Sequence, residues 1–375
     1  MSDIEFPVKA ITWSVYEQKT PILLQEENGP CPLIALVNTL LLASDIEART
    51  TAWGKENAVL PESKESGSAS SSPQPNGSAR IKELLNKHVG DRVSLVELLA
   101  CLGDALLERT QVEANVVSDL LESLPLLHTG LTVNPNLVSG GFPPQDLAAK
   151  IFDAFGLTFV HAWIWEPGHN KDADSVFPSL QTFDAVQDFL LTKDEETEPN
   201  AEVSAVSAWL DENSTQLTSH GLSVLDKQLP ADSVAIFFRN NHFSTLYKAD
   251  NHDLYLLLTD TAFIKRPEFV WQSVISASGK DDLFFSGDFT PINDELEPWA
   301  SYPNDDMAVA RQLQEEEDAA TAQRLQASYN TKKSKQKGTT VSEGAKGAKE
   351  QPSKKASKKE TKEGKSKKKG NCVIV

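Results

Sequence analysis

Cysteine and methionine are scarce in this sequence, whose 375 residues include three cysteines and two methionines. Cys31, Cys101 and Cys372 lie far apart and match neither a disulfide framework nor the spacing of metal ligands. We therefore expect a reducing, intracellular setting and a protein that needs no metal and no cofactor. The N-terminal residues lack the basic and apolar segments of a secretory signal, and the longest apolar run, Leu33–Ala43, is too short to span a bilayer.

Positive charge is also scarce until the last part of the chain. The net charge is −18, from 36 Lys and Arg against 54 Asp and Glu. From Thr331 onward there are 15 Lys and 4 Glu, a net charge of +11, so the preceding 330 residues carry a net charge of −29. An acidic body argues against nucleic acid as its specific ligand. The hydrophobic content of 39% is enough for a sizeable core.

A polar turn, Gln25–Pro32, delivers one cysteine to the start of the apolar segment Leu33–Leu42, which predicts a buried helix. Pro32 suits the first helical position, because its missing N–H would have had no partner there. Cys31 then faces free backbone N–H groups and the positive end of the helix dipole, which favour the nucleophilic thiolate. The alternative is that Cys31 is a small buried hydrophobe, the commoner fate of a free cysteine.

Hydrolysis by a thiol needs a base beside it, a group that orients the base and donors for the oxyanion. Of the seven histidines, His242 stands where one apolar strand, Val234–Phe238, breaks and the next, Phe243–Tyr247, begins. The alternative is a turn histidine that satisfies neighbouring carbonyls. Gln25, six residues before Cys31, is the right residue type for a side-chain oxyanion donor, although a lone Gln is more often a surface residue.

The order of the predicted elements favours an α+β fold, in which helices precede an antiparallel sheet. Strands are predicted at Val8–Trp13, Pro21–Leu24, Thr158–Trp165, Val234–Phe238, Phe243–Tyr247 and Leu254–Thr259. Helices are predicted at Val93–Asn115, Asp146–Phe155, Phe183–Leu191 and Val203–Leu210, with a turn at Thr218–Leu222 and a disordered low-complexity insertion at Glu62–Ala79. Cys101 falls on the apolar pattern of its helix, so we assign it to packing.

Two blocks of sequence, Gln25–Leu33 and Phe238–Thr245, resemble the signature blocks of the MINDY deubiquitinases, cysteine peptidases that cleave ubiquitin chains. Further blocks match in the same order, at Leu131–Asn136, His161–Trp163, Ser219–Leu222 and Leu256–Asp260. The resemblance covers roughly Phe6 to Phe289 and is to a fungal-type member with a C-terminal prenylation box. It implies that residues 1–300 form a catalytic domain of the papain-like cysteine peptidase type.

The resemblance also implies roles for single residues. Cys31 becomes the nucleophile, His242 the base and Gln25 an oxyanion donor. The third catalytic member falls on Thr259, but its spacing from His242 is one residue longer than expected, so Asp260 is the alternative. The family further implies a preference for chains linked through lysine 48 of ubiquitin and the trimming of long chains.

Residues 304–330 predict an exposed helix with a narrow apolar stripe between acidic residues. The stripe consists of Met307, Ala310 and Leu313, and the repeat of residues 310–314 twelve positions later adds Ala322 and Leu325. This pattern resembles the motif interacting with ubiquitin. Because twelve residues rotate a helix by about 120° relative to the first stripe, two ubiquitins could dock on different sides. The alternative is an amphipathic helix that packs on its own domain.

Residues 331–375 form a Lys-rich tail that we expect to be disordered, since Thr331–Gly370 contains no aromatic residue and cannot bury a core. Cys372–Val375 reads as a C-a-a-X prenylation box, and Lys365–Lys369 supply a second, polybasic signal for membrane binding. We therefore expect a cytoplasmic protein held peripherally on a membrane by lipidated Cys372. The alternatives are an accidental C-terminal cysteine and a tail that binds nucleic acid nonspecifically.

Together these features predict a deubiquitinase that hydrolyses isopeptide bonds in polyubiquitin through Cys31. The alternative function is a catalytically inactive, membrane-tethered polyubiquitin receptor. The presence of Gln25, Cys31 and His242 together favours the enzyme.

Overall fold

The computed structural model describes residues 4–26, 29–56, 77–108, 114–193, 200–279 and 281–292, all within one unit, residues 1–293. The strands are β1 (Glu5–Trp13), β2 (Tyr16–Leu23), β3 (Arg92–Ser94), β4 (Phe159–His161), β5 (Ser233–Arg239), β6 (His242–Lys248), β7 (Leu254–Leu257), β8 (Trp271–Ser273) and β9 (Phe284–Phe285). The helices are α1 (Cys31–Glu56), α2 (Gly77–Lys87), α3 (Leu95–Leu107), α4 (Ala114–Ser123), α5 (Leu147–Ala154), α6 (Lys171–Leu180), α7 (Phe183–Lys193), α8 (Ala201–Glu212) and α9 (Ser219–Gln228), with short 3-10 helices η1 (Leu124–His128) and η2 (Thr261–Phe263). The predictions for residues 304–330 and 331–375 lie outside the described residues.

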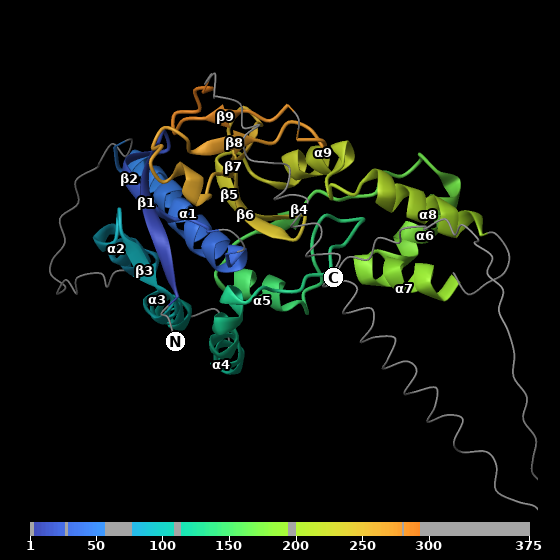
Figure 1. Ribbon diagram of the computed structural model, residues 1–375, viewed down its shortest axis with the longest axis horizontal. Helices are drawn as coiled ribbons and strands as arrows, with labels where there is room; N and C mark the ends of the chain where they lie inside the picture. The colour runs from blue at the N-terminus through green and yellow to red at the C-terminus, as the bar shows by residue number, and fades with distance from the viewer. Residues whose placement is uncertain are drawn as a thin grey trace, which may run out of the picture. The chain divides into compact units, whose positions relative to one another are not determined.

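These strands form two sheets (Figure 1). The smaller sheet has the order β2-β1-β3 and is antiparallel throughout. The larger has the order β4-β5-β6-β7-β8-β9, with β4 parallel to β5 and every other neighbouring pair antiparallel. The predicted antiparallel sheet is therefore correct except for the β4–β5 pair, and the fold mixes α and β structure.

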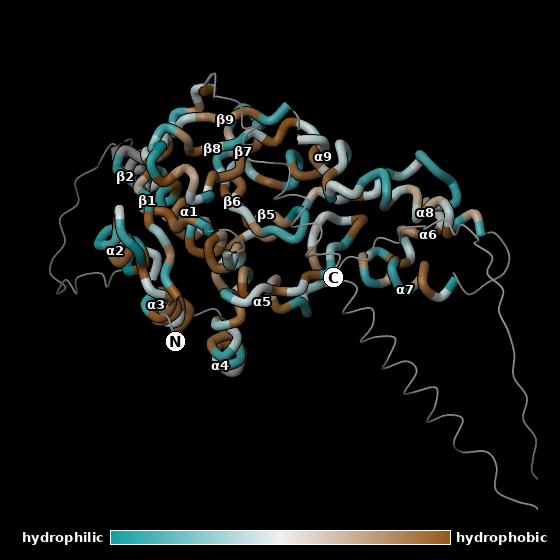
Figure 2. The backbone as a smooth tube through the Cα atoms, in the orientation of Figure 1, coloured by the Kyte–Doolittle hydropathy of each residue, from teal (hydrophilic) through white to brown (hydrophobic). Residues whose placement is uncertain are grey.

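Helix α1 contacts both sheets, through β2 and through β5 and β6. Leu33, Leu36, Val37 and Leu41 are fully buried because the helix is apolar around most of its circumference. Figure 2 shows hydrophobic residues concentrated in this central region. By length and composition the stretch Cys31–Thr51 could cross a membrane, but 67% of it is buried within the fold, as expected of a central core helix.

The helix predicted over Val93–Asn115 is interrupted in the structure. The first two residues belong to β3, and Ser94 begins α3 through a capping box in which its side chain accepts from the Glu97 N–H. Helix α3 ends at Leu107 and a second helix, α4, follows. The predicted disordered insertion ends too late, because Gly77–Ala79 already belong to α2. Residues 57–76 lie outside the described part of the chain.

The turn predicted at Thr218–Leu222 is wrong, because these residues open helix α9. The Thr218 hydroxyl caps the helix by accepting from the Gly221 N–H at 2.9 Å. A Cβ at position 221 would lie 1.9 Å from the Ala162 carbonyl oxygen, so only glycine lets α9 approach the end of β4 this closely.

Helix α6 was not predicted, and strand β4 is shorter than the predicted Thr158–Trp165. The chain leaves the sheet after β4 because Trp163 and Trp165 pack into a cluster of aromatic rings on the helices. Trp165 stacks on Phe177 of α6, with ring centroids 4.7 Å apart, and Trp163 stacks on Trp209 of α8 at 5.8 Å. The helices at Phe183–Leu191, Val203–Leu210 and Asp146–Phe155 are confirmed within a few residues.

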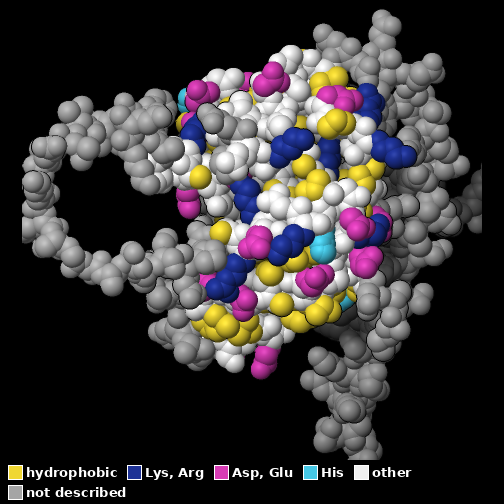
Figure 3. All heavy atoms as spheres, turned by 90° about the vertical axis from the view of Figure 1, so that its left-hand side faces the viewer, with side chains coloured by type: hydrophobic (Ala, Val, Ile, Leu, Met, Phe, Trp, Pro, Cys, Tyr) yellow, Lys and Arg dark blue, Asp and Glu magenta, His cyan; other side chains and the backbone are white. Residues whose placement is uncertain are grey.

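The face that carries α2 and α3 mixes charges of both signs. Figure 3 shows Lys and Arg side chains beside Asp and Glu over this face, with hydrophobic atoms gathered at its lower edge. Arg80 pairs with Asp104 at 3.3 Å and with Glu108 at 2.9 Å, and Lys87 pairs with Glu83 at 2.9 Å. Several acidic side chains on this face are therefore paired with basic ones.

His161, at the end of β4, is a buried and neutral structural histidine. Its Nε2 donates to the Gly141 carbonyl at 3.1 Å, and its Nδ1 accepts from the Trp163 N–H at 3.1 Å, which fixes the tautomer. Burial lowers the pKa of His161 to about 4, because a charged imidazole would lose its hydration.

The lowered pKa of His161 predicts a loss of stability in acid. Between about pH 6.5 and pH 4 this histidine is protonated in the unfolded chain but stays neutral in the folded chain. The contribution of His161 to the free energy of unfolding is therefore complete above pH 6.5 and falls as the pH drops. Between pH 7 and pH 5 the wild type should lose about 2 kcal/mol more free energy of unfolding than His161→Gln. Urea unfolding of both proteins at both pH values measures the difference, and equal losses would contradict the assignment.

Candidate functional site

Cys31 is the first residue of α1, as the Pro-Cys-Pro turn predicted, and its side chain is partly buried. The end of β2 is held against α1 by a polar side chain of that apolar helix. The fully buried Asn38 accepts from the Leu23 N–H at 2.8 Å and donates to the Leu23 carbonyl at 3.0 Å. Sequence reasoning overlooked Asn38, although a lone Asn in an apolar helix indicates a buried hydrogen-bond role.

His242 is the first residue of β6 and follows the tight hairpin turn that joins β5 to β6. Arg239 and His242 pair directly, and Asn240 and Asn241 form the two-residue loop between them with φ of 50° and 56°. Such a loop is a type I′ turn, whose two left-handed positions asparagine tolerates better than most residues. The break in the apolar pattern at His242 was therefore correctly interpreted as the end of one strand and the start of the next.

The packing of α1 on β6 brings Cys31 and the start of β6 together. The hydroxyls of Thr39 and Thr245 lie 3.0 Å apart, and the Thr245 hydroxyl donates to the Ala35 carbonyl at 3.4 Å. One turn earlier along the helix, the backbone of Phe243 lies close enough to Cys31 to lower the pKa of its thiol. Because Phe243 follows His242 in β6, the structure brings the predicted nucleophile and the predicted base into the same region.

Burial disfavours the charged forms of both groups in this arrangement. It raises the pKa of the Cys31 thiol, although hydrogen bonds from the backbones of Phe243 and Cys31 act in the opposite direction. It lowers the pKa of His242. Within the described residues no hydrogen bond joins the two side chains. The raised pKa of Cys31 opposes the thiolate that the helix start predicted.

Gln25 lies beside the helix start, and its side chain meets the Cys31 backbone at one oxygen atom. Gln25 Nε2 donates to the Gly29 carbonyl at 3.0 Å, and the Cys31 N–H donates to the same carbonyl at 2.9 Å. A side-chain amide and the N–H of the nucleophile are the donors that an oxyanion hole requires. In this structure the Gly29 carbonyl oxygen occupies the point at which these two donors converge.

Thr259 and Asp260 contact Gln25 rather than His242. The Gln25 N–H donates to the Thr259 carbonyl at 2.6 Å, and the Thr261 N–H donates to the Gln25 carbonyl at 3.1 Å, which forms a short parallel bridge. The exposed Asp260 carboxylate caps η2 by accepting from the Ala262 N–H at 2.6 Å. Among the described contacts neither side chain reaches His242, so the orienting role of Thr259 stays a prediction.

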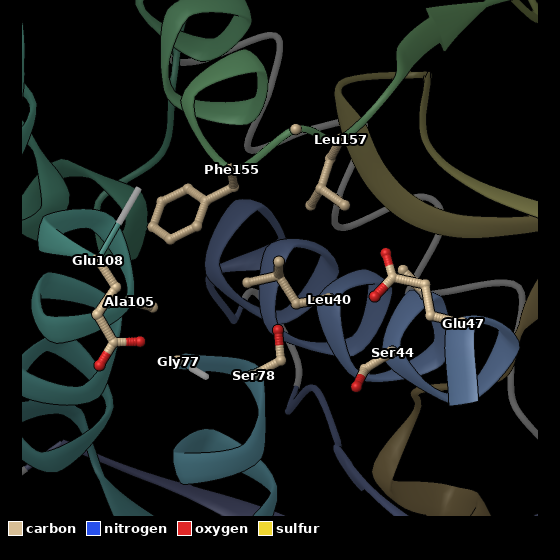
Figure 4. A pocket seen from close by; sticks show the side chains of 11 residues that line it. Leu40, Ser44, Glu47, Gly77, Ser78, Ala105, Glu108, Phe155 and Leu157 are labelled. Atoms are coloured by element: carbon tan, nitrogen blue, oxygen red, sulfur yellow. The ribbon is translucent and has the colours of Figure 1, made fainter. Parts of the chain in front are cut away.

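A cavity of about 200 Å³ lies away from these residues (Figure 4). It is lined by side chains from α1, α2, α3 and the turn after α5, among them Leu40, Glu47, Ala105, Glu108 and Leu157. Its lining includes neither Cys31 nor His242. Among the described residues there is also no group of three or more His, Cys, Asp and Glu side chains that could hold a metal ion.

Cys101, on α3, is partly exposed and packs against the main core. Burial is the largest effect on its thiol and raises its pKa. The described structure therefore agrees with the packing role predicted for Cys101. Met307, Ala310, Leu313, Ala322, Leu325 and Cys372 lie outside the described residues.

A cysteine at a helix start, a histidine on a neighbouring strand and two converging N–H donors are the arrangement of a cysteine-dependent hydrolase. Comparison with known proteins gives the particular family. The model of the MINDY deubiquitinase family matches residues 4–289. The chain belongs to this family and is a cysteine-type deubiquitinase.

Several relatives align over most of this chain. The ubiquitin carboxyl-terminal hydrolase MIY1 of Saccharomyces cerevisiae is 33% identical over 298 residues, which cover 77% of this chain and 73% of that protein. The ubiquitin carboxyl-terminal hydrolase MINDY-1 of Rattus norvegicus is 31% identical over 299 residues, with 76% of this chain and 53% of that protein covered. The uncharacterized protein YGL082W of Saccharomyces cerevisiae is 30% identical over 351 residues, with coverages of 82% and 83%.

Proposed function

We propose that this chain hydrolyses isopeptide bonds in polyubiquitin, with Cys31 as the nucleophile and His242 as the base. The observation that carries the proposal is the convergence of Gln25 Nε2 and the Cys31 N–H beside a sulfur that contacts the start of β6. In the proposed reaction His242 takes the thiol proton, the sulfur attacks the isopeptide carbonyl and the imidazolium then protonates the leaving lysine amine. Water hydrolyses the resulting thioester.

The oxyanion of the tetrahedral intermediate needs the position that the Gly29 carbonyl oxygen holds. Gly29 must therefore turn away before Gln25 and the Cys31 N–H can donate to substrate. Gly29 is followed by Pro30 and is itself tightly placed, since a Cβ there would lie 2.9 Å from the Glu26 carbonyl oxygen. Binding of the ubiquitin tail supplies the free energy for this local rearrangement.

The substrate that we propose is a chain linked through lysine 48 of ubiquitin, trimmed from a long polymer. This preference is implied by the resemblance to the family. The member that we propose is of the fungal type, with a C-terminal prenylation box. The two apolar stripes centred on Ala310 and Ala322 support the preference, since a pair of ubiquitin-binding motifs favours long chains over short ones by multivalent binding.

Replacement of the nucleophile tests the proposed chemistry. Cys31→Ala should lower hydrolysis of lysine 48-linked tetra-ubiquitin to less than about a thousandth of the wild-type rate, since the covalent route is lost. Cys101→Ala is the matched control and should retain the wild-type rate. The measurement is cleavage across a panel of tetra-ubiquitins of defined linkage.

A ubiquitin carrying a C-terminal electrophile separates the enzyme from the alternative, a catalytically inactive membrane-tethered ubiquitin receptor. The enzyme forms a covalent adduct at Cys31, whereas the receptor binds the probe without forming one. Undiminished hydrolysis by Cys31→Ala would reject the proposed nucleophile.

We also propose that residues 304–330 hold neighbouring ubiquitins of the chain. The double variant Ala310→Asp with Ala322→Asp places a bulky charge in both apolar stripes and should weaken binding of lysine 48-linked tetra-ubiquitin by about 10-fold or more. Ser328→Asp adds the same charge off the stripes and should bind normally. Calorimetric titration of Cys31→Ala backgrounds measures binding without cleavage, and equal affinities for all variants would contradict the proposal.

A third proposal concerns localisation. Cys372 is prenylated and, with Lys365–Lys369, holds the protein on a membrane from the cytoplasmic side, because one lipid chain binds weakly without a second signal. Cys372→Ser should shift the protein from the membrane to the soluble fraction on cell fractionation, whereas Cys101→Ser should leave it on the membrane. An unchanged distribution of Cys372→Ser would end this proposal.

A further inference from the structure

The tip of the β5–β6 hairpin is tied to two loops that lie outside it. From the last position of β5, Arg239 Nε donates to the Thr215 carbonyl at 3.0 Å and Arg239 Nη2 donates to the Ala277 carbonyl at 2.9 Å. In the turn itself, the Asn240 N–H donates to Gln216 Oε1 at 2.9 Å. Three hydrogen bonds therefore restrain a two-residue turn that would otherwise be free to move.

The loop that receives two of these bonds is firmly held. Gln216 is buried and has φ of 51°, and the next residue, Leu217, is fully buried and forms a bridge with Ala162 at the end of β4. The Thr218 N–H donates to the Ala162 carbonyl at 3.0 Å and its hydroxyl to the Ile164 carbonyl at 2.9 Å. The hairpin tip is thus connected to the rigid edge of the larger sheet.

These hydrogen bonds at the hairpin tip are important because few other hydrogen bonds among the described residues orient the His242 ring. Within the described part of the chain the ring makes no hydrogen bond to another side chain, and Thr259 and Asp260 contact Gln25 and η2 instead. Directly paired residues of an antiparallel ladder project from the same face, with Cβ atoms about 5 Å apart. Because Arg239 pairs with His242, the restraint on Arg239 acts on the backbone from which the imidazole projects.

We propose that Arg239, assisted by Gln216, is a positioning residue that holds His242 within reach of the Cys31 sulfur by tethering the hairpin tip to the Thr215 and Ala277 carbonyls. The inference rests on the proposed function, since it gives His242 the role of base. Arg239 fits this role better than lysine would, because its guanidinium can donate in two directions at once.

Steady-state kinetics on tetra-ubiquitin, normalised to the folded fraction, test the proposal. Arg239→Met removes both bonds and should lower kcat about 100-fold with KM changed less than about threefold, because a misplaced base slows chemistry rather than binding. Arg239→Lys restores one donor and should lose only about 10-fold. Gln216→Met, which removes the acceptor for Asn240 at similar volume, should also lower kcat with little change in KM.

Arg49→Met is the matched control. Arg49 pairs at 2.7 Å with Asp232, the residue before β5, so its loss removes an arginine contact near the opposite end of that strand and leaves the hairpin tip unchanged. It should keep kcat and KM within about twofold of wild type. If Arg49→Met lost as much kcat as Arg239→Met, general destabilisation would explain both and the proposal would be wrong.

A second readout reports on the pair of groups without ubiquitin. The rate at which iodoacetamide alkylates Cys31 is followed against pH in the wild type, in His242→Ala and in the Arg239 variants, by mass spectrometry of the Cys31 peptide. The Arg239→Met profile should move from the wild-type shape toward that of His242→Ala, with the Arg239→Lys profile between them. A wild-type profile in Arg239→Met, or a rise in KM without loss of kcat, would overturn the positioning role.

The two proposals fail in different ways. If Cys31→Ala still cleaves chains, the proposed nucleophile is wrong whatever Arg239 does. If Cys31→Ala is inactive while Arg239→Met keeps its kcat and its alkylation profile, only the positioning role is wrong.

Discussion

The site depends on the way helix α1 packs against strand β6. A polar contact inside an apolar interface fixes that packing, because the buried hydroxyls of Thr39 and Thr245 satisfy each other and the Ala35 carbonyl. A shift of α1 along β6 would leave these buried hydroxyls without hydrogen-bond partners. The loss in free energy of unfolding would be larger than that for losing an apolar contact. Since Cys31 lies two helical turns before Thr39, the same register places its sulfur at Phe243, next to His242.

Backbone groups take part in many of the hydrogen bonds near the Cys31 sulfur. The Thr259 carbonyl and the Thr261 N–H hold Gln25, and the Gly29 carbonyl accepts from Gln25 Nε2 and from the Cys31 N–H. The Asn38 side chain adds two hydrogen bonds, one to the N–H and one to the carbonyl of Leu23. These contacts therefore join the helix start to β2 and to the segment after β7.

The local features of the site could be predicted from the sequence, whereas the contacts between distant segments could not. Proline and glycine around Cys31 specify a helix start, and the polar break at His242 specifies a hairpin, since both depend on neighbouring residues. The bridge between Gln25 and Asp260 joins segments more than 200 residues apart. The contacts of Arg239 could not be predicted, because its two acceptors are backbone carbonyls, which no side-chain pattern reveals.

The electrostatic state of the site agrees with its closed geometry. Burial favours a neutral Cys31 and a neutral His242, so the resting protein does not hold a thiolate ready for attack. The Gly29 carbonyl has the same consequence, since it accepts from the two N–H groups that the proposed reaction needs for the oxyanion. Under the proposed function, substrate has to displace the Gly29 carbonyl before its own carbonyl can reach these donors. In the proposed mechanism the arrival of a ubiquitin tail, rather than a preformed thiolate, therefore starts the reaction.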